Sequence, residues 1–109
     1  MITTRPLQII FFDVWTSLII SHDGYKYYVI FVDHFTKYIW FYPLKRKSDV
    51  QTVFKRYKAI VEKYFQQNIV SLYLDNGGEY IALKTFLFEN GISHLTTPPH
   101  TSEHNGFSE

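Results

Sequence analysis

The amino-acid sequence predicts an α/β domain, a mixed five-stranded sheet with helices packed against it. The 109 residues are 46% hydrophobic and 19% aromatic, which is enough for one packed core and little more than one domain. Three strand-like apolar runs come first, followed by an amphipathic helix and then by alternating strand, helix and strand. The first helix is expected to be a crossover that makes the fourth strand parallel to the first.

Three strands are predicted in the first half of the chain, at residues 7–14, 25–33 and 38–44. The first is a continuous apolar run, as expected for a buried central strand. Residues 34–37 are few enough to join the second and third strands as an antiparallel hairpin. Pro43 fits near a strand end or on an edge strand, because it has no N–H to donate.

A helix is predicted over residues 49–65. Ser48 can cap its start, and Gln51 follows three residues later, as in a capping box. Apolar residues then recur at helical spacing and form one stripe, which is expected to pack on the sheet. The stripe consists of Val50, Val53, Phe54, Tyr57, Ile60, Val61, Tyr64 and Phe65.

The second half of the chain predicts a strand at 69–74, a helix at 80–89 and a short strand at 92–96. Asn90-Gly91 is a stop signal for the second helix. With the crossover above, the fourth strand lies beside the first and runs the same way. The carboxyl ends of such neighbouring strands are where open α/β sheets place their functional sites.

Charge and composition narrow the function only slightly. The net charge is +1, but seven of the eleven Lys and Arg residues lie between Lys45 and Lys63. This run is either a solvated helix face or a surface that follows phosphates, and the sequence leaves both open. The absence of cysteine excludes disulfides and thiolate metal sites. No stretch is apolar enough for a signal peptide or a membrane span, so we expect the nucleus or the cytoplasm.

Three acids are the candidate functional residues: Asp13, Asp75 and Glu109. The first two close apolar strands that are predicted to be neighbours, and Asp75 precedes the glycine turn at 76–78. Carboxylates that converge in this way hold Mg²⁺, and paired Mg²⁺ ions promote in-line phosphoryl transfer. Taken one at a time, each acid has an ordinary alternative, as a strand-end cap, a turn residue or a chain terminus.

Two other sets of residues are interpreted structurally. Asp33 also ends a strand and is expected to bond the local backbone rather than a metal ion. Five aromatic side chains are expected in the core rather than on a base-stacking platform. They are Trp15, Tyr27, Tyr28, Phe31 and Trp40.

Four blocks in order, DVW at Asp13, YYVIFVDHFTKYIWFYPLKRKSDV, LDNGGEY at Asp75 and the closing HTSEHNGFSE, resemble the integrase catalytic core of copia-type LTR retrotransposons. The resemblance covers nearly the whole chain. It implies an RNase H-like fold with Asp13, Asp75 and Glu109 at the positions of a D,D,E site for Mg²⁺ or Mn²⁺. The implied chemistry is 3′-end processing and strand transfer of retroelement cDNA into target DNA, by a homodimer or a higher oligomer.

The resemblance also sets an expectation for the ends of the domain. In the family the Glu lies on a long helix that continues past the position of Glu109, so residues 1–109 are expected to be a catalytic core that is incomplete at its C-terminus. A catalytically inactive, domesticated or decayed core that serves as an interaction or dimerisation module, through the helix at 49–65, is therefore the main alternative. A nuclease of the same fold is a third.

The loop predicted at residues 97–106 contains a second motif. Residues 100–104 spell H-x-x-E-H, the pattern of inverted zinc peptidases, but Pro and Gly flank it and the motif requires a helix. We therefore reject the zinc site. In the family this loop lies beside the active site, so His100, His104 and Asn105 are the expected DNA contacts.

Overall fold

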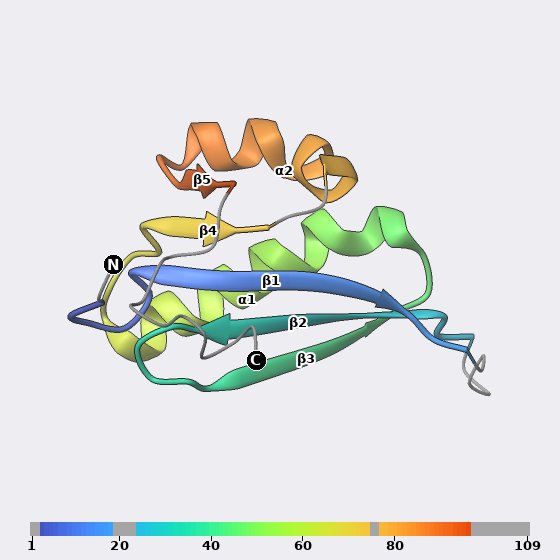
Figure 1. Ribbon diagram of the computed structural model, residues 1–109, viewed down its shortest axis with the longest axis horizontal. Helices are drawn as coiled ribbons and strands as arrows, with labels where there is room; N and C mark the ends of the chain where they lie inside the picture. The colour runs from blue at the N-terminus through green and yellow to red at the C-terminus, as the bar shows by residue number, and fades with distance from the viewer. Residues whose placement is uncertain (1–2, 19–23, 75–76, 97–109) are drawn as a thin grey trace.

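The computed structural model describes residues 3–18, 24–74 and 77–96. Within them the chain forms β1 (Ile9–Thr16), β2 (Tyr27–Asp33), β3 (Ile39–Leu44), α1 (Val50–Phe65), β4 (Ser71–Tyr73), α2 (Gly77–Glu89) and β5 (Ser93–Leu95), with a short 3₁₀ turn, Lys47–Asp49, before α1. The strands make one sheet in the order β3-β2-β1-β4-β5 (Figure 1).

The pairing of the strands confirms the predicted mixed sheet. β1 is antiparallel to β2, and β2 is antiparallel to β3, as in the predicted hairpin. β1 is parallel to β4, and β4 is parallel to β5, because α1 and α2 carry the chain back across the sheet. The crossover that the sequence predicted therefore puts β1 and β4 side by side.

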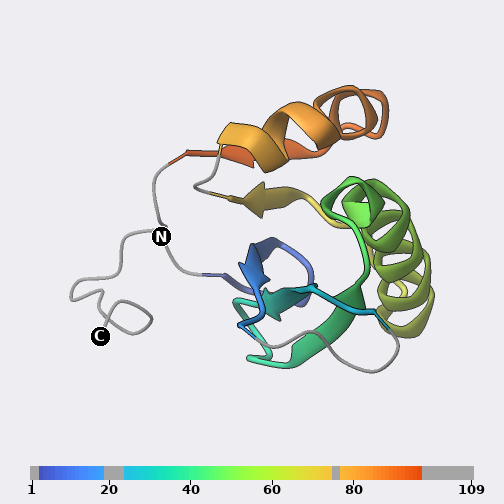
Figure 2. The ribbon, with the colours of Figure 1, turned by 90° about the vertical axis from the view of Figure 1, so that its right-hand side faces the viewer.

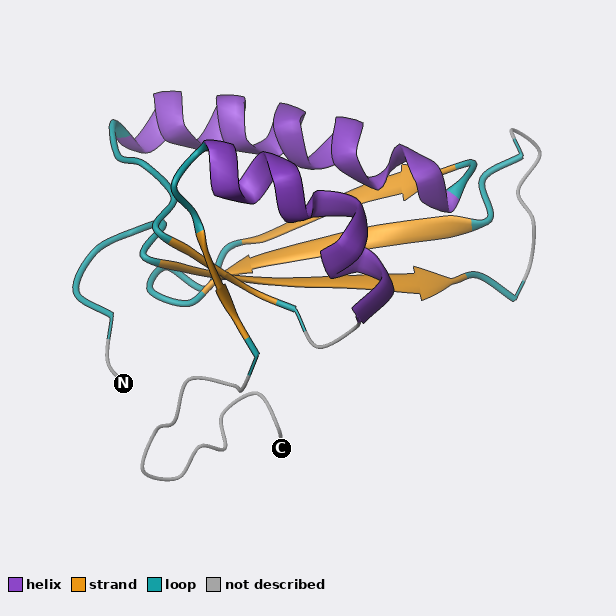
Figure 3. Ribbon diagram, turned by 90° about the horizontal axis from the view of Figure 1, so that it is seen from above, coloured by secondary structure: helices purple, strands orange, loops and turns teal. Residues whose placement is uncertain are grey.

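Both helices lie on one face of the sheet, which we call the covered face (Figures 2 and 3). The Phe31 ring on β2 stacks on the Tyr57 ring of α1 at a centroid distance of 4.0 Å. The Phe54 ring of α1 meets the Phe86 ring of α2 edge to face at 5.8 Å, which joins the two helices. These aromatic contacts anchor a core that continues through buried aliphatic side chains, Leu7, Ile10, Val29, Leu44, Val50, Val61, Leu72, Leu83 and Leu87 among them.

No described helix lies on the opposite face, which we call the open face (Figure 2). The prediction that all five aromatic residues are core residues is therefore partly wrong. Phe31 is buried, and Tyr27 and Trp40 pack against the core. Trp15 is 50% exposed on the open face, where its ring stacks on Tyr28 at 6.2 Å. The alternation of side chains along a strand puts these two rings away from the helices.

The helix starts differ from those that the sequence predicts. The N-cap of α1 is Asp49, whose side chain makes no capping bond, so the predicted capping box at Ser48 and Gln51 does not form the start of the helix. Helix α2 begins at Gly77, three residues before the predicted start, so the predicted turn through Gly78 is helical. Glycine tolerates a helix as well as a turn, and its presence alone could not separate the two.

The end of α2 is as predicted. Gly91 has a φ of 67°, in the left-handed region that favours glycine. The Ile92 N–H donates to the Leu87 carbonyl at 2.9 Å, and the Gly91 N–H donates to the Phe88 carbonyl at 3.2 Å. This pair of bonds is a Schellman motif, closed by two buried side chains, Leu87 and Ile92.

The strands start or end one or two residues from their predicted limits. β1 begins at Ile9 rather than at residue 7, because Leu7 has a φ of 68° and cannot continue a strand. The apolar stripe of α1 is also narrower than predicted, since Ile60 is 43% exposed and Tyr64 is 68% exposed. The core of α1 is formed by Val50, Phe54, Tyr57 and Val61.

Candidate functional site

Asp13 lies within β1 and not at its end as predicted, because the strand continues to Thr16, and its side chain is exposed. The residues on either side of it, Phe12 and Val14, face the helices, because one is buried and the other packs against the core. Asp13 therefore projects from the open face, together with Phe11 and Trp15. The strand gives the carboxylate a rigid base and direct access to solvent.

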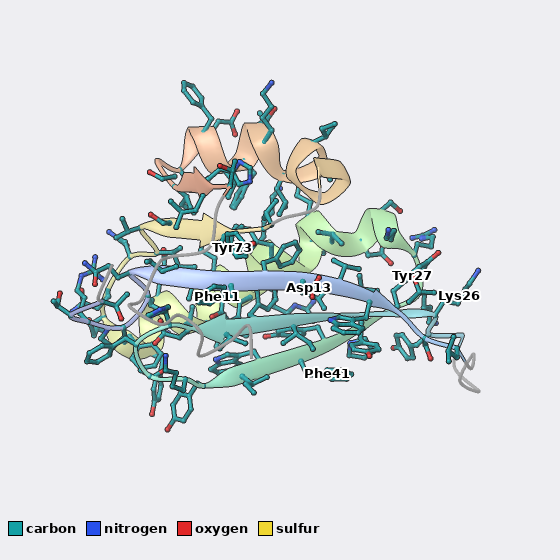
Figure 4. The ribbon with its side chains drawn as sticks, in the orientation of Figure 1. Phe11, Asp13, Lys26, Tyr27, Phe41 and Tyr73 are labelled. Atoms are coloured by element: carbon teal, nitrogen blue, oxygen red, sulfur yellow. The ribbon has the colours of Figure 1, made fainter. Side chains whose placement is uncertain are left out.

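The parallel pairing of β1 and β4 sets the relation between the first two predicted ligands. Phe11 is the register partner of Tyr73, and their rings meet edge to face at 5.4 Å (Figure 4). Asp13 comes two residues after Phe11, and Asp75 comes two residues after Tyr73 in the sequence. Asp75 and Glu109 themselves lie outside the described residues, as do His100, His104 and Asn105.

Asp13 borders a hollow of about 210 Å³ on the open face. Among the described residues its other walls are almost entirely apolar, and Asp13 is the one acidic group that they place there. The lining residues are Phe11, Phe12, Asp13, Trp15, Ile30, Val32 and Tyr73.

The described residues do not by themselves form a metal site. Among them, no three His, Asp or Glu side chains come together in a way that could hold a metal ion. Of the predicted triad, only Asp13 belongs to that part of the chain. An exposed carboxylate is a suitable ligand for Mg²⁺, and all three ligands of the predicted site stay a prediction.

Asp33, the other acid at the end of a strand, has a structural role, as predicted. It is 1% exposed, and its carboxylate accepts hydrogen bonds from the Leu7 N–H at 2.9 Å and from the Thr36 N–H at 2.9 Å. The first bond holds Leu7 in its left-handed conformation before β1. The second closes the β2–β3 turn, so this carboxylate is committed to the fold.

No sequence pattern indicated the role of His34, which follows Asp33. His34 is 9% exposed, its Nδ1 lies 3.1 Å from the Thr3 hydroxyl, and its ring stacks on Phe11 at 5.5 Å. Burial, helped by the nearby Lys37 ammonium, lowers the pKa of His34 below its usual value. The contact partners come from the chain before β1 and from β1 itself, so no local sequence signal could have indicated them.

The basic run between Lys45 and Lys63 divides into two parts in the structure. Lys58 donates to Glu62 at 2.9 Å in a half-buried pair, one turn apart on α1. Arg46 and Asp49 form a pair at 3.5 Å, with the arginine side chain 77% exposed. The Lys58–Glu62 pair stabilises the helix. The Arg46–Asp49 pair lies at the N-terminal end of α1, on a different surface from Asp13.

Comparison with known proteins assigns the class. The family described as "Integrase core domain" matches residues 3–102, so the chain belongs to that family. The chain is 59% identical over 107 residues to "Retrovirus-related Pol polyprotein from transposon RE1" of Arabidopsis thaliana, and 37% identical over 106 residues to the corresponding polyprotein from transposon TNT 1-94 of Nicotiana tabacum. These matches confirm the resemblance to copia-type elements.

The matches cover almost all of this chain but little of the relatives. The alignments include 98% and 94% of the chain, but only 7% and 8% of the two polyproteins. A solved structure titled as a simian T-cell lymphotropic virus intasome in complex with a PP2A regulatory subunit aligns over 96% of this chain and 39% of its own, with a TM-score of 0.63 and 18% identity. That likeness confirms the RNase H-like fold.

In the part of the chain that the structure describes, neither helix is long and apolar enough to cross a membrane.

Proposed function

We propose that this chain is the catalytic core of an integrase that joins retroelement cDNA to target DNA, with Asp13, Asp75 and Glu109 as its three acidic ligands. The proposal covers both 3′-end processing and strand transfer. Membership of the integrase core family supports the reaction class. The position of Asp13 on the open face supports the assignment of the first ligand.

The observation that carries the proposal is the register of β1 against β4. Phe11 and Tyr73 are partners in two parallel strands, and a predicted ligand follows each of them by two residues. Parallel neighbours advance in the same direction at the same rise per residue, so positions that follow a register pair by equal steps are expected to stay close. Two acids at such positions could share a metal ion.

The acids would hold Mg²⁺ or Mn²⁺, which prefer hard oxygen ligands. When bound, the ions would activate the attacking oxygen and stabilise the departing 3′ oxygen. The role of the chain is to hold its carboxylates in place before the ions arrive, and the rigid strand under Asp13 meets that need. The hollow beside it is lined by apolar side chains, among them Phe11 and Trp15.

The proposed substrates are the cDNA ends of a retroelement and a target duplex. His100, His104 and Asn105 are proposed to contact that DNA, on the strength of the family resemblance alone. The proposal implies a location in the nucleus or the cytoplasm, because cDNA copies and target DNA occur there.

The test is a joining assay on the 109-residue chain in Mn²⁺, with a labelled duplex that carries a recessed 3′-hydroxyl and a plasmid as target. Joined or nicked products are expected, and Asp13→Asn should abolish them. Glu89→Gln is the matched control, since it neutralises an exposed acid at the end of α2 and should leave the products unchanged. Products that persist in Asp13→Asn would refute the site.

Self-association is a second proposed property, and a specific observation favours it. Ile60 and Tyr64 lie one turn apart on the outer side of α1 and are 43% and 68% exposed. Exposed apolar side chains at such spacing suit a helix-to-helix interface. Sedimentation of the wild-type chain should show a homodimer or a higher oligomer, and Tyr64→Ser should shift it toward monomer. This property is compatible with catalysis, and would remain if the core were inactive.

A further inference from the structure

Six of the eleven Lys and Arg residues gather at one end of the molecule. At this end β1 finishes, β2 starts, β3 finishes and α1 begins, since Thr16 pairs with Tyr27 and Tyr27 pairs with Leu44. The Lys26 N–H donates to the Leu44 carbonyl at 3.0 Å, which brings Lys26 beside Lys45. Figure 4 shows Lys26 at this end of the sheet. The basic residues of this end are Lys26, Lys45, Arg46, Lys47, Lys55 and Arg56, and all of them are exposed.

The acids have the opposite distribution. Asp33 ends β2 and so lies at the far end of the sheet, and Glu62 and Glu89 lie in the last turns of α1 and α2. Among the described residues at the basic end, Asp49 is the one carboxylate. It pairs with Arg46 at 3.5 Å, at a partly exposed position where such a pair contributes little. This end therefore carries a strong excess of positive charge, although the whole chain has a net charge of only +1.

A groove of about 260 Å³ runs between the end of β3 and the first turns of α1. Lys45 and Arg56 line it from opposite elements, and Asp49 also lines it. The Lys45 ammonium lies over the Tyr25 ring at 5.4 Å, which holds the charge at the rim of the groove. The remaining lining residues are Tyr25, Pro43, Leu44, Thr52 and Val53.

The start of α1 adds to the positive potential of the groove. The N-cap Asp49 makes no side-chain capping bond at the start of the 16-residue helix, and the Val50 N–H donates to the Lys47 carbonyl of the 3₁₀ turn before it. The aligned peptide dipoles of the helix place partial positive charge at this end. This contribution adds to the two side-chain cations, which carry the argument.

We propose that this basic groove, lined by Lys45 and Arg56 and flanked by Lys26 and Arg46, binds the phosphate backbone of duplex DNA. The inference rests on the proposed function, which supplies DNA as the partner, and adds a binding surface away from the three acids. β1 runs toward this end, and Thr16 lies three residues beyond Asp13, a rise of about 10 Å. The groove lies two strands further across, since Thr16 pairs with Tyr27 and Tyr27 pairs with Leu44, which adds about 10 Å. A duplex presents about one phosphate charge for each 1.7 Å of its axis, so both positions lie within the span of one bound duplex.

The test is the anisotropy of a labelled duplex of mixed sequence, titrated with the 109-residue chain in EDTA between about 50 and 200 mM salt. EDTA removes any contribution from metal at Asp13. The double variant Lys45→Gln/Arg56→Gln should weaken binding roughly tenfold and reduce the slope of log K against log salt by about two, because two phosphate contacts are lost. Each single variant should reduce the slope by about one.

The control variant is Lys63→Gln/Lys84→Gln, which removes the same charge from exposed positions outside the groove. It should change the affinity less than about twofold. Asp49→Asn should act in the opposite direction and tighten binding about twofold, because a carboxylate leaves the groove while Asn remains a good N-cap. Circular dichroism checks that each variant is folded.

The possible failures are distinct. Equal weakening by the groove variant and the control variant would mean that net charge alone attracts DNA, and would overturn the groove. The same holds if the folded wild-type chain binds no DNA in EDTA. Groove-dependent binding by a chain that shows no Asp13-dependent joining would instead leave the groove in place and overturn the proposed catalytic site.

Discussion

The two faces of the sheet use polar side chains in opposite ways. On the covered face, Asp33 is buried and bonds two backbone N–H groups, and the Tyr57 hydroxyl is enclosed among aromatic rings. On the open face, Asp13 is exposed beside an apolar hollow. The two aspartates lie on neighbouring antiparallel strands of one sheet, yet one is buried and the other is exposed.

Burial, rather than residue type, separates an acid that stabilises the fold from one that solvent can reach. A buried carboxylate must have its oxygens bonded, or the free energy of unfolding falls by several kcal/mol. An exposed carboxylate is solvated by water, so the fold does not require it to be bonded to other protein groups. On a rigid strand it is held in place to bind a ligand. Substitution of the buried acid should therefore change the free energy of unfolding, and substitution of the exposed acid should change the response to metal ions.

The largest effect is expected from Asp33→Ala on the covered face. It leaves the Leu7 and Thr36 N–H groups without their acceptor, and should lower the free energy of unfolding by roughly 3 kcal/mol. Urea denaturation measures the loss. Asp33→Asn keeps one acceptor oxygen and should lose about half as much. A loss below about 1 kcal/mol for the alanine variant would mean that these N–H groups find other partners. Asp33 would then not be required for the fold, and the two aspartates would not differ in this respect.

Asp13→Asn on the open face should change stability only when metal is present. Without metal, the free energy of unfolding should stay within about 0.5 kcal/mol of the wild type, as for other exposed sites. With Mg²⁺ or Mn²⁺ at one hundred times its dissociation constant, the wild-type chain should gain about 2.7 kcal/mol, and the variant should lose that gain. Thermal denaturation with and without each ion measures both. An equal gain in the variant would remove Asp13 from the metal site.

Tyr57→Phe, a substitution on the covered face, should stabilise the protein. The Tyr57 hydroxyl is buried, and has no hydrogen-bond partner in the part of the chain that the structure describes. Burial, with the charge of Asp33 nearby, raises the pKa of Tyr57 above its usual range, so the group stays neutral. Removal of the hydroxyl should raise the free energy of unfolding by about 1 kcal/mol. Tyr42→Phe, at a half-buried ring, is the control and should have a smaller effect; a loss of stability in Tyr57→Phe would reveal a missing partner.

The smallest effect concerns His34, at the edge of the open face. Because burial lowers its pKa in the folded state below 6.5, the unfolded chain takes up a proton first as the pH falls. Stability should therefore decrease as the pH falls through about 6.5, and the decrease should end below the folded-state pKa. Urea denaturation from pH 7.5 to 5 compares the wild type with His34→Gln, which does not titrate. Parallel curves for the two proteins would show that His34 makes no contribution.

Local patterns were enough to predict the helices and most of the strand limits. The stripe through Val50, Phe54 and Tyr57 has helical spacing that no strand can use. Asn90-Gly91 ends a helix because Gly91 readily adopts the positive φ of the C-terminal turn. The errors fall where two local structures are equally allowed. Gly77 suits both a turn and a helix start, and Ser48 and Asp49 are both good N-caps.

The order of the elements, the mixed sheet and the family could all be predicted from the sequence, because spacing, turn residues and the integrase motifs are carried by neighbours along the chain. The face of the sheet that each side chain occupies depends on how the elements pack. The helices cover one face, so Trp15 is exposed where Phe31 is buried, and Asp13 is exposed where Asp33 is buried. The gathering of Lys26 beside Lys45 and Arg56 also depends on strand pairing, since contacts between distant segments leave no periodic signal in the chain.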